Sequence, residues 1–226
     1  MFHCRSVSHH QTPLVIREKL SLTDAQQAQW LRDHAGVEAV ILSTCNRLEL
    51  YAHTPSVAIV DDLWRDLLSQ RGVVPHDVEQ YTIQLTGQDA IDHLYRVSCG
   101  LESMALGEPQ ILGQVTHAFE LAHEHDATGH ALSLLFRSAI HAAKRARTET
   151  EIGGGSASVS SLGITRAEAV SGGLKNREVL VIGAGEMAQT IVKGLSQRGV
   201  SSVTVVSRTY ESARLLAEQW LSLIHI

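Results

Sequence analysis

Hydrophobic positions recur along this chain with two spacings, every second residue in some segments and every third or fourth in others. The first spacing is typical of strands and the second of helices. At 48–53, three apolar residues alternate with polar neighbours, as in a half-buried strand, and 37–42 is a short apolar, β-branched run. Further strands are expected at 2–7 and 78–84, and helices at 14–20, 23–34, 57–71, 87–99, from about 107 and at 132–149. This pattern predicts an open-faced α+β sandwich, with helices on one side of a mainly antiparallel sheet.

The pattern changes after residue 150. Two glycine-rich breaks, at 153–156 and 171–173, flank a helix expected at 158–170. A strand, a glycine turn, a helix, a strand and a helix then follow, at 179–182, 183–188, 188–197, 202–206 and from 210. That order is typical of the first half of a Rossmann-type doubly wound domain, so the predicted fold class is α/β.

We therefore expect three parts in this chain. They are a catalytic α+β domain at 1–150, a linker helix region at 151–173 and a partial nucleotide-binding domain at 174–220. The segment 221–226 does not continue the helical pattern. We expect it to be a tail foreign to the natural protein, attached to a truncated chain.

Composition narrows the class of protein. The chain has 226 residues, of which 44% are hydrophobic and 19% charged, as in an ordinary globular protein. The sequence shows neither an apolar run of membrane-spanning length nor a signal-peptide pattern. Three cysteines without metal-type spacing indicate a reduced, cytoplasmic setting and predict no metal site. A net charge of −5 argues against general nucleic-acid binding, so such a partner would need a local basic patch.

Cys45 carries the most distinctive chemistry. It falls at the corner between two predicted strands, where a side chain can face a ligand. A thiolate is a strong nucleophile, and the guanidinium of Arg47 is expected to lower the pKa of the Cys45 thiol. The alternative is a small cysteine that packs inertly, and the residue types leave both interpretations open.

A glycine-rich turn joins the strand at 179–182 to the next helix. Its residues are Gly183, Ala184, Gly185, Glu186, Met187 and Ala188. The two glycines permit a tight turn and close approach of a pyrophosphate, and the alanine permits close helix packing. The next strand is followed by Ser207, Arg208 and Thr209, where NAD enzymes usually have an acidic residue. Arg208 therefore favours the 2′-phosphate of NADP, with a solvated loop charge as the alternative.

A third segment places polar residues around the start of a helix. Pro109 suits the first turn, and Gln110 and Gln114 lie one turn apart on the same face. Together with Ser103 and Glu108, the glutamines form a set able to line a pocket for an amino-acid group. A capped helix with solvated glutamines is the plainer alternative.

Two stretches resemble the glutamyl-tRNA reductase family. One is Thr44-Cys45-Asn46-Arg47 followed by Glu49 and Tyr51, and the other is the long motif at 100–115. The segment 8–18 is similar to the family start, less tightly. The resemblance implies NADPH-dependent reduction of glutamyl-tRNA(Glu) to glutamate-1-semialdehyde with release of tRNA. This reaction is the first step of 5-aminolevulinate and tetrapyrrole (porphyrin) biosynthesis by the five-carbon route.

The resemblance also implies roles for single residues and for partners. Cys45 is the nucleophile that forms a thioester, and His93, by itself an ordinary surface histidine of a helix, is catalytic. The residues expected around the glutamyl group are Thr44, Asn46, Arg47, Ser103, Glu108, Pro109, Gln110 and Gln114. We also expect Arg47 to hold the substrate's γ-carboxylate in a bidentate fork. The family further implies a homodimer, whose C-terminal dimerisation domain is expected to be missing here, and glutamate-1-semialdehyde aminomutase as the acceptor of the product.

Two other functions remain open on the residues. An NADP-dependent dehydrogenase of a small metabolite, with a structural Cys45, explains the glycine turn but neither family motif. A non-catalytic, truncated tRNA-binding fragment is the other. Lys144, Arg145 and Arg147, at the end of a predicted helix, are either solvated charges that complement the helix dipole or contacts to tRNA phosphates.

Overall fold

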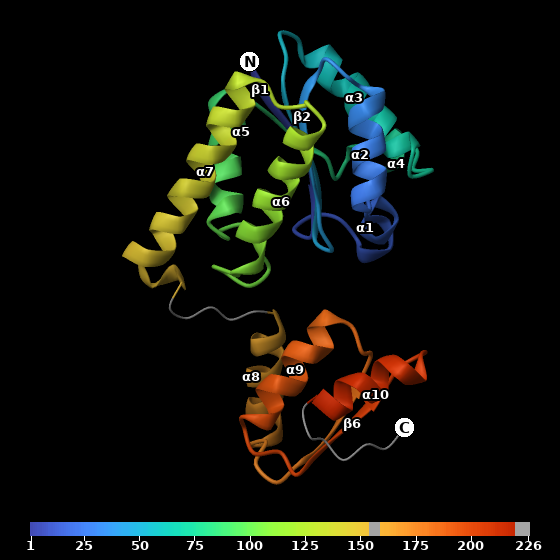
Figure 1. Ribbon diagram of the computed structural model, residues 1–226, viewed down its shortest axis with the longest axis vertical. Helices are drawn as coiled ribbons and strands as arrows, with labels where there is room; N and C mark the ends of the chain where they lie inside the picture. The colour runs from blue at the N-terminus through green and yellow to red at the C-terminus, as the bar shows by residue number, and fades with distance from the viewer. Residues whose placement is uncertain (154–158, 220–226) are drawn as a thin grey trace. The chain divides into compact units, whose positions relative to one another are not determined.

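The structure of the chain, a computed structural model, describes residues 1–153 and 159–219 (Figure 1). The chain divides into two compact units, Met1–Ser156 and Ala157–Ile226, and each unit has its own hydrophobic core. Most of the predicted break at 153–156 and the whole predicted tail at 221–226 lie outside the described residues.

The first unit is built on a four-stranded antiparallel sheet with the strand order β2-β3-β1-β4. The strands are β1 Phe2–Ser8, β2 Glu38–Ser43, β3 Arg47–His53 and β4 Ile83–Thr86. In the register of the sheet, Ser6 of β1 lies opposite Glu49 of β3. β1 and β3 are therefore the two central strands.

Helices connect and cover these strands. Within the described part of the first unit they are α1 Leu14–Leu20, α2 Asp24–Asp33, α3 Val57–Ser69, α4 Pro75–Glu79, α5 Gln88–Ser98, α6 Gln110–Glu124 and α7 His130–Glu149, with a short 3-10 turn at Glu151–Gly153. Local signals set several of their ends. Thr23 and Gln26 form a capping box at the start of α2, and Gly72 follows α3 with a left-handed φ of +64°. The strand predicted at 78–84 is wrong over its first part, because Pro75 opens the short helix α4 and β4 begins at Ile83.

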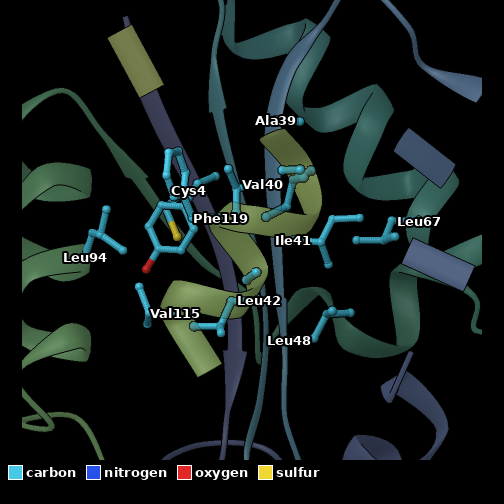
Figure 2. Packing of buried hydrophobic residues seen from close by; sticks show 14 of the residues in the cluster. Cys4, Ala39, Val40, Ile41, Leu42, Leu48, Leu67, Leu94, Val115 and Phe119 are labelled. Carbon is cyan, nitrogen blue, oxygen red and sulfur yellow. The ribbon is translucent and has the colours of Figure 1, made fainter. Parts of the chain in front are cut away.

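Both faces of the sheet are covered, so the predicted open-faced sandwich is wrong. Figure 1 shows α1 to α4 on one side of the sheet and α5 to α7 on the other. In Figure 2, Ile41 points toward Leu67 of α3, whereas Val40 and Leu42 point the other way, toward α6. β3, predicted to be half-buried, is buried at every position from Arg47 to Ala52. The alternating pattern predicted the exposure of β3 wrongly, because the polar side chains of this strand bind one another inside the protein. Arg47 and Tyr51 both donate to the carboxylate of Glu49.

The second unit has the expected order of a nucleotide-binding half-domain. α8 Val159–Ser171 precedes β5 Glu178–Ile182, α9 Glu186–Ser196, β6 Ser202–Val206 and α10 Tyr210–Gln219. β5 and β6 are parallel, with Glu178 opposite Ser202 and Ile182 opposite Val206. The helix α8, which the sequence analysis assigned to a linker region, packs in this unit: its Ile164 is buried in the same core as Val192 of α9. The two units thus divide before α8, whereas we expected the boundary at 171–173.

None of the helices in the described segments has both the length and the apolar character needed to cross a lipid bilayer.

Candidate active site

Cys45 lies at the tip of the tight connection between β2 and β3. The backbone N–H of Thr44 donates to the carbonyl of Arg47 at 2.9 Å, which closes the turn. The Thr44 hydroxyl accepts from the N–H groups of Asn46 and Arg47, at 3.1 and 3.2 Å. These bonds fix the backbone on both sides of Cys45, whose side chain is exposed. The predicted strand-to-strand corner is therefore present.

A narrow cleft opens beside this corner. The residues that line it are Thr44, Cys45, Asn46, Arg47, Ser103, Glu108, Ile111 and Gln114. Seven of these eight are residues that the sequence analysis assigned to the substrate site. Pro109 and Gln110 were assigned there too, but both are exposed and neither lines the cleft. The cleft volume is about 10 Å³, roughly the room of one water, so lining side chains must move to admit an amino-acid group.

Three arginines hold the loop that carries Ser103 and Glu108. Arg47 donates to the carbonyl of Glu102, and Arg96 donates to the carboxylate of Glu102 at 2.6 Å. Arg147 of α7 donates to the carbonyls of Gly107 at 3.1 Å and Glu108 at 2.7 Å. Neither predicted role of the basic helix end, as solvated charges or as phosphate contacts, describes Arg147. Its guanidinium instead fixes this loop. Arg145 pairs with Glu149 on the surface of the same helix.

Glu49 is the centre of a buried polar network next to the cleft. One of its carboxylate oxygens accepts from Ser6, Arg47 and His93 at 2.9, 2.9 and 3.0 Å, and the other accepts from the Tyr51 hydroxyl at 2.7 Å. Burial alone would raise the pKa of Glu49, but the charge of Arg47 and the hydrogen bonds hold it well below its usual range. Glu49 is therefore ionised, fully buried and completely satisfied.

This network corrects the role predicted for Arg47. Its two terminal nitrogens already bind Glu49 and the carbonyl of Glu102, and its side chain is only 2% exposed. Arg47 therefore does not offer a free fork to a γ-carboxylate in this structure. Its charge is balanced by Glu49, and the cation that lowers the pKa of Cys45 is Arg17 rather than Arg47, the residue we expected.

The pKa of the Cys45 thiol is raised, first by partial burial and then by the charge of Glu108. Arg17 of α1 acts in the opposite direction. Its guanidinium donates to the Cys45 carbonyl at 3.1 Å and to the Asn46 side chain at 3.2 Å. The sequence analysis gave Arg17 no role. Its place in the segment similar to the family start was the one signal that pointed to it.

His93 of α5 binds Glu49 and is not among the residues that line the cleft. Its side chain is 14% exposed, so it is more buried than an ordinary surface histidine. Cys4, Glu49 and His93 also lie close enough together to suggest a metal site. Because the Glu49 oxygens already accept four hydrogen bonds, this group is better described as a satisfied polar core than as a metal site.

The second unit has a cavity of about 630 Å³ at the carboxyl ends of β5 and β6. Its lining includes Gly183, Ala184, Gly185, Ser207, Arg208 and Thr209, six of the nine residues predicted to bind the cofactor. Gly183 has a left-handed φ of +112°, and a Cβ on Gly185 would meet no atom within 4 Å. Ala188 is buried in the core, and Met187 is exposed outside the cavity lining. The open space beside Gly185 would let a dinucleotide's pyrophosphate approach the backbone, and the N-terminus of α9 would favour its negative charge.

Comparisons with known proteins agree with this division. The family model described as "Glutamyl-tRNAGlu reductase, N-terminal domain" matches residues 6–150, and the model described as "Shikimate / quinate 5-dehydrogenase" matches residues 165–224. A glutamyl-tRNA reductase from Rubrobacter xylanophilus is 42% identical over 215 residues, which are 93% of this chain and 50% of the relative. One from Priestia megaterium is 40% identical over 219 residues, or 92% of this chain and 48% of the relative.

The fold points to the same family. The solved structure of glutamyl-tRNA reductase from Methanopyrus kandleri matches with a TM-score of 0.66 and 34% identity, covering 99% of this chain and 53% of that one. This chain thus spans about half the length of the relatives it matches. The family model covers well over half of the 226 residues and includes the whole cleft around Cys45. The chain belongs to the glutamyl-tRNA reductase family.

Proposed function

We propose that the protein reduces glutamyl-tRNA(Glu) to glutamate-1-semialdehyde with NADPH and releases tRNA, as the first step of tetrapyrrole biosynthesis. The observation that carries this proposal is the cleft itself. Residues from two segments, 44–47 and 103–114, meet around an exposed cysteine, and all eight lie within the stretches that resemble the family's motifs. A metabolite dehydrogenase with a structural cysteine would leave that convergence unexplained.

In the proposed reaction, the sulfur of Cys45 attacks the ester carbonyl that joins glutamate to the tRNA. A C–S bond forms, the C–O bond to the ribose breaks, and the tRNA leaves with a proton on its ribose oxygen. Asn46, Ser103 and Gln114 line the cleft with uncharged donors and acceptors that can hold the glutamyl group. Arg47 and His93 keep positioning roles through Glu49, because both side chains bind its carboxylate.

The cavity in the second unit is the proposed NADPH site. Gly183, Gly185 and the start of α9 would hold the pyrophosphate, and Arg208 would hold the 2′-phosphate. When bound, NADPH supplies the hydride that converts the thioester to the aldehyde. A homodimer, a cytoplasmic setting and delivery of the aldehyde to glutamate-1-semialdehyde aminomutase belong to the same proposal, on the strength of the family relationship.

The test is to incubate the protein with glutamyl-tRNA(Glu) carrying labelled glutamate, without NADPH. We expect an acid-stable adduct on Cys45, located by peptide mass analysis. Cys45→Ser should lose the label, and Cys99→Ser, which changes a half-buried cysteine outside the cleft lining, should keep it. A wild-type protein that stays unlabelled, or label that persists in Cys45→Ser, would contradict the proposal.

A further inference from the structure

Glu108 lies in the loop between α5 and α6, just before the start of α6. It lines the cleft beside Cys45, yet the residue is only 8% exposed. Its own backbone carbonyl accepts from Arg147 at 2.7 Å, and the preceding carbonyl of Gly107 accepts from the same guanidinium at 3.1 Å. The backbone of Glu108 is therefore fixed, and its side chain is held in the cleft.

The carboxylate of Glu108 has no hydrogen-bond or ion-pair partner among residues 1–153 and 159–219. The positive charges of Arg47 and Arg147 act on this carboxylate without a hydrogen bond to it. The Arg47 guanidinium binds Glu49, and the Arg147 guanidinium binds backbone carbonyls. Burial raises the pKa of Glu108 in spite of both arginines. The carboxyl group of Glu108 is thus partly desolvated and bound by no protein group in the cleft, which leaves it free to take part in the chemistry of the site.

Glu108 and Cys45 line the same cleft, and the charge of Glu108 acts on the Cys45 thiol. After burial, its negative charge is the largest influence that raises the pKa of Cys45, while Arg17 lowers it. The thiol of Cys45 is therefore protonated at neutral pH, and the carboxyl group of Glu108 lines the same cleft, where it can accept the thiol proton. A protonated thiol needs a base before it can attack an ester. His93, the histidine that the family resemblance suggests, does not line the cleft.

We propose that Glu108 is the acid–base partner of Cys45 in glutamyl transfer. As the Cys45 sulfur forms its bond to the ester carbonyl carbon, the thiol proton passes to the Glu108 carboxylate. As the C–O bond breaks, the same proton passes to the departing ribose oxygen of the tRNA, and Glu108 is ionised again. This inference rests on the proposed function and adds a residue to it.

The test compares two reactions of Cys45 in the wild type and in Glu108→Gln. The first is alkylation by iodoacetamide, followed on the Cys45 peptide across pH. Its iodide leaving group needs no proton, so an acid has no part in it. The second is transfer of labelled glutamate from glutamyl-tRNA(Glu) without NADPH, which does need a proton on the leaving oxygen.

We expect the two reactions to change in opposite directions. Removing the Glu108 charge lowers the Cys45 pKa, so alkylation of Glu108→Gln near pH 7.5 should be several-fold faster than in the wild type. Glutamyl transfer should be slower by roughly 100-fold or more, the usual contribution of a positioned acid–base group. Glu108→Asp retains a carboxylate and should recover part of the transfer rate. Glu124→Gln, which changes an exposed carboxylate on the same helix, should alter neither reaction.

The opposite changes separate a chemical role from a structural one, because a damaged cleft would slow both reactions or leave the alkylation profile unchanged. Equal transfer rates in the wild type and Glu108→Gln would overturn this inference and leave the proposed function standing. An unchanged alkylation profile would also overturn it, since Glu108 would then exert no influence on the thiol. A wild type that forms no adduct at all would overturn the proposed function and this role together.

Discussion

Glu49 illustrates how one residue can dictate the character of a whole strand. In the sequence it looks like the solvent-facing member of an alternating pattern, but its carboxylate is fully buried and binds four side chains. Two of these partners, Ser6 and His93, lie 43 and 44 residues away along the chain. Arg47, which pairs with Glu49, also donates to the carbonyl of Glu102. It thereby holds the loop that carries Ser103 and Glu108, here called the cleft loop. Core stability and site geometry therefore share one network.

Replacing Glu49 with Gln should destabilise the fold. Arg47 would remain buried without a counter-charge, and breaking one partner of a buried pair usually costs about 3–5 kcal/mol. Urea unfolding would show this as a lower midpoint at an unchanged slope. As a control, Asp62→Asn removes one partner of the exposed Arg65 pair and should change the midpoint little. Equal midpoints for the two variants would mean that the Glu49 network contributes no more than a surface pair.

Arg17, rather than Arg47, is the cation that favours the Cys45 thiolate. Because Arg17 lowers the pKa of Cys45, Arg17→Gln should raise it further. The pH profile of Cys45 alkylation would then move to higher pH, and the rate near pH 7.5 would fall. This is the opposite of the change expected for Glu108→Gln. Arg65→Gln, on the surface of α3, is the matched control. A profile that moves only in an Arg47 variant would restore the original prediction for Arg47.

At the scale of elements, the parts of the site that the sequence predicted are those encoded locally. The corner at Cys45 depends on two short strands and a threonine within one residue of the cysteine. The glycine turn and Arg208 likewise follow from a strand and a helix that adjoin them. The covering of the second sheet face could not be predicted, because it depends on which distant helices pack there. The anchoring of the cleft loop by Arg147, from nearly 40 residues away, is hidden for the same reason.

The cleft loop also depends on glycine at 107. Gly107 has a φ of +74°, and a Cβ there would lie 2.5 Å from the backbone oxygen of Ile152. Gly107→Ala should therefore cost roughly 2 kcal/mol or more in the free energy of unfolding, from left-handed strain and from the clash. It should also slow glutamyl transfer to Cys45, because Glu108 is the next residue.

Gly113 on α6 provides a matched comparison for this change. A Cβ there would meet no atom within 4 Å, so Gly113→Ala should stabilise the helix by about 0.5–1 kcal/mol. Urea unfolding of the two variants measures both effects. Similar stabilities for the two alanine variants would show that the loop can relax around residue 107.

At the scale of the whole molecule, the proposed chemistry is divided between the two units. The nucleophile and its cleft belong to the first unit, and the cavity proposed for NADPH belongs to the second. Each unit has a separate hydrophobic core. A ligand that binds one folded unit stabilises that unit by mass action and adds no stability to an independently folded neighbour.

This division predicts where NADPH should protect the backbone. In hydrogen exchange followed by mass spectrometry, saturating NADPH should slow exchange in peptides from 178–209 and leave those from 2–53 unchanged. Gly185→Val is the control: a Cβ at this position meets no atom within 4 Å, so the unit should fold, but the side chain would block the approach of the pyrophosphate. The protection should then disappear. Protection that survives in Gly185→Val would place the cofactor elsewhere, and protection that extends to the Cys45 corner would show that the two units respond as one.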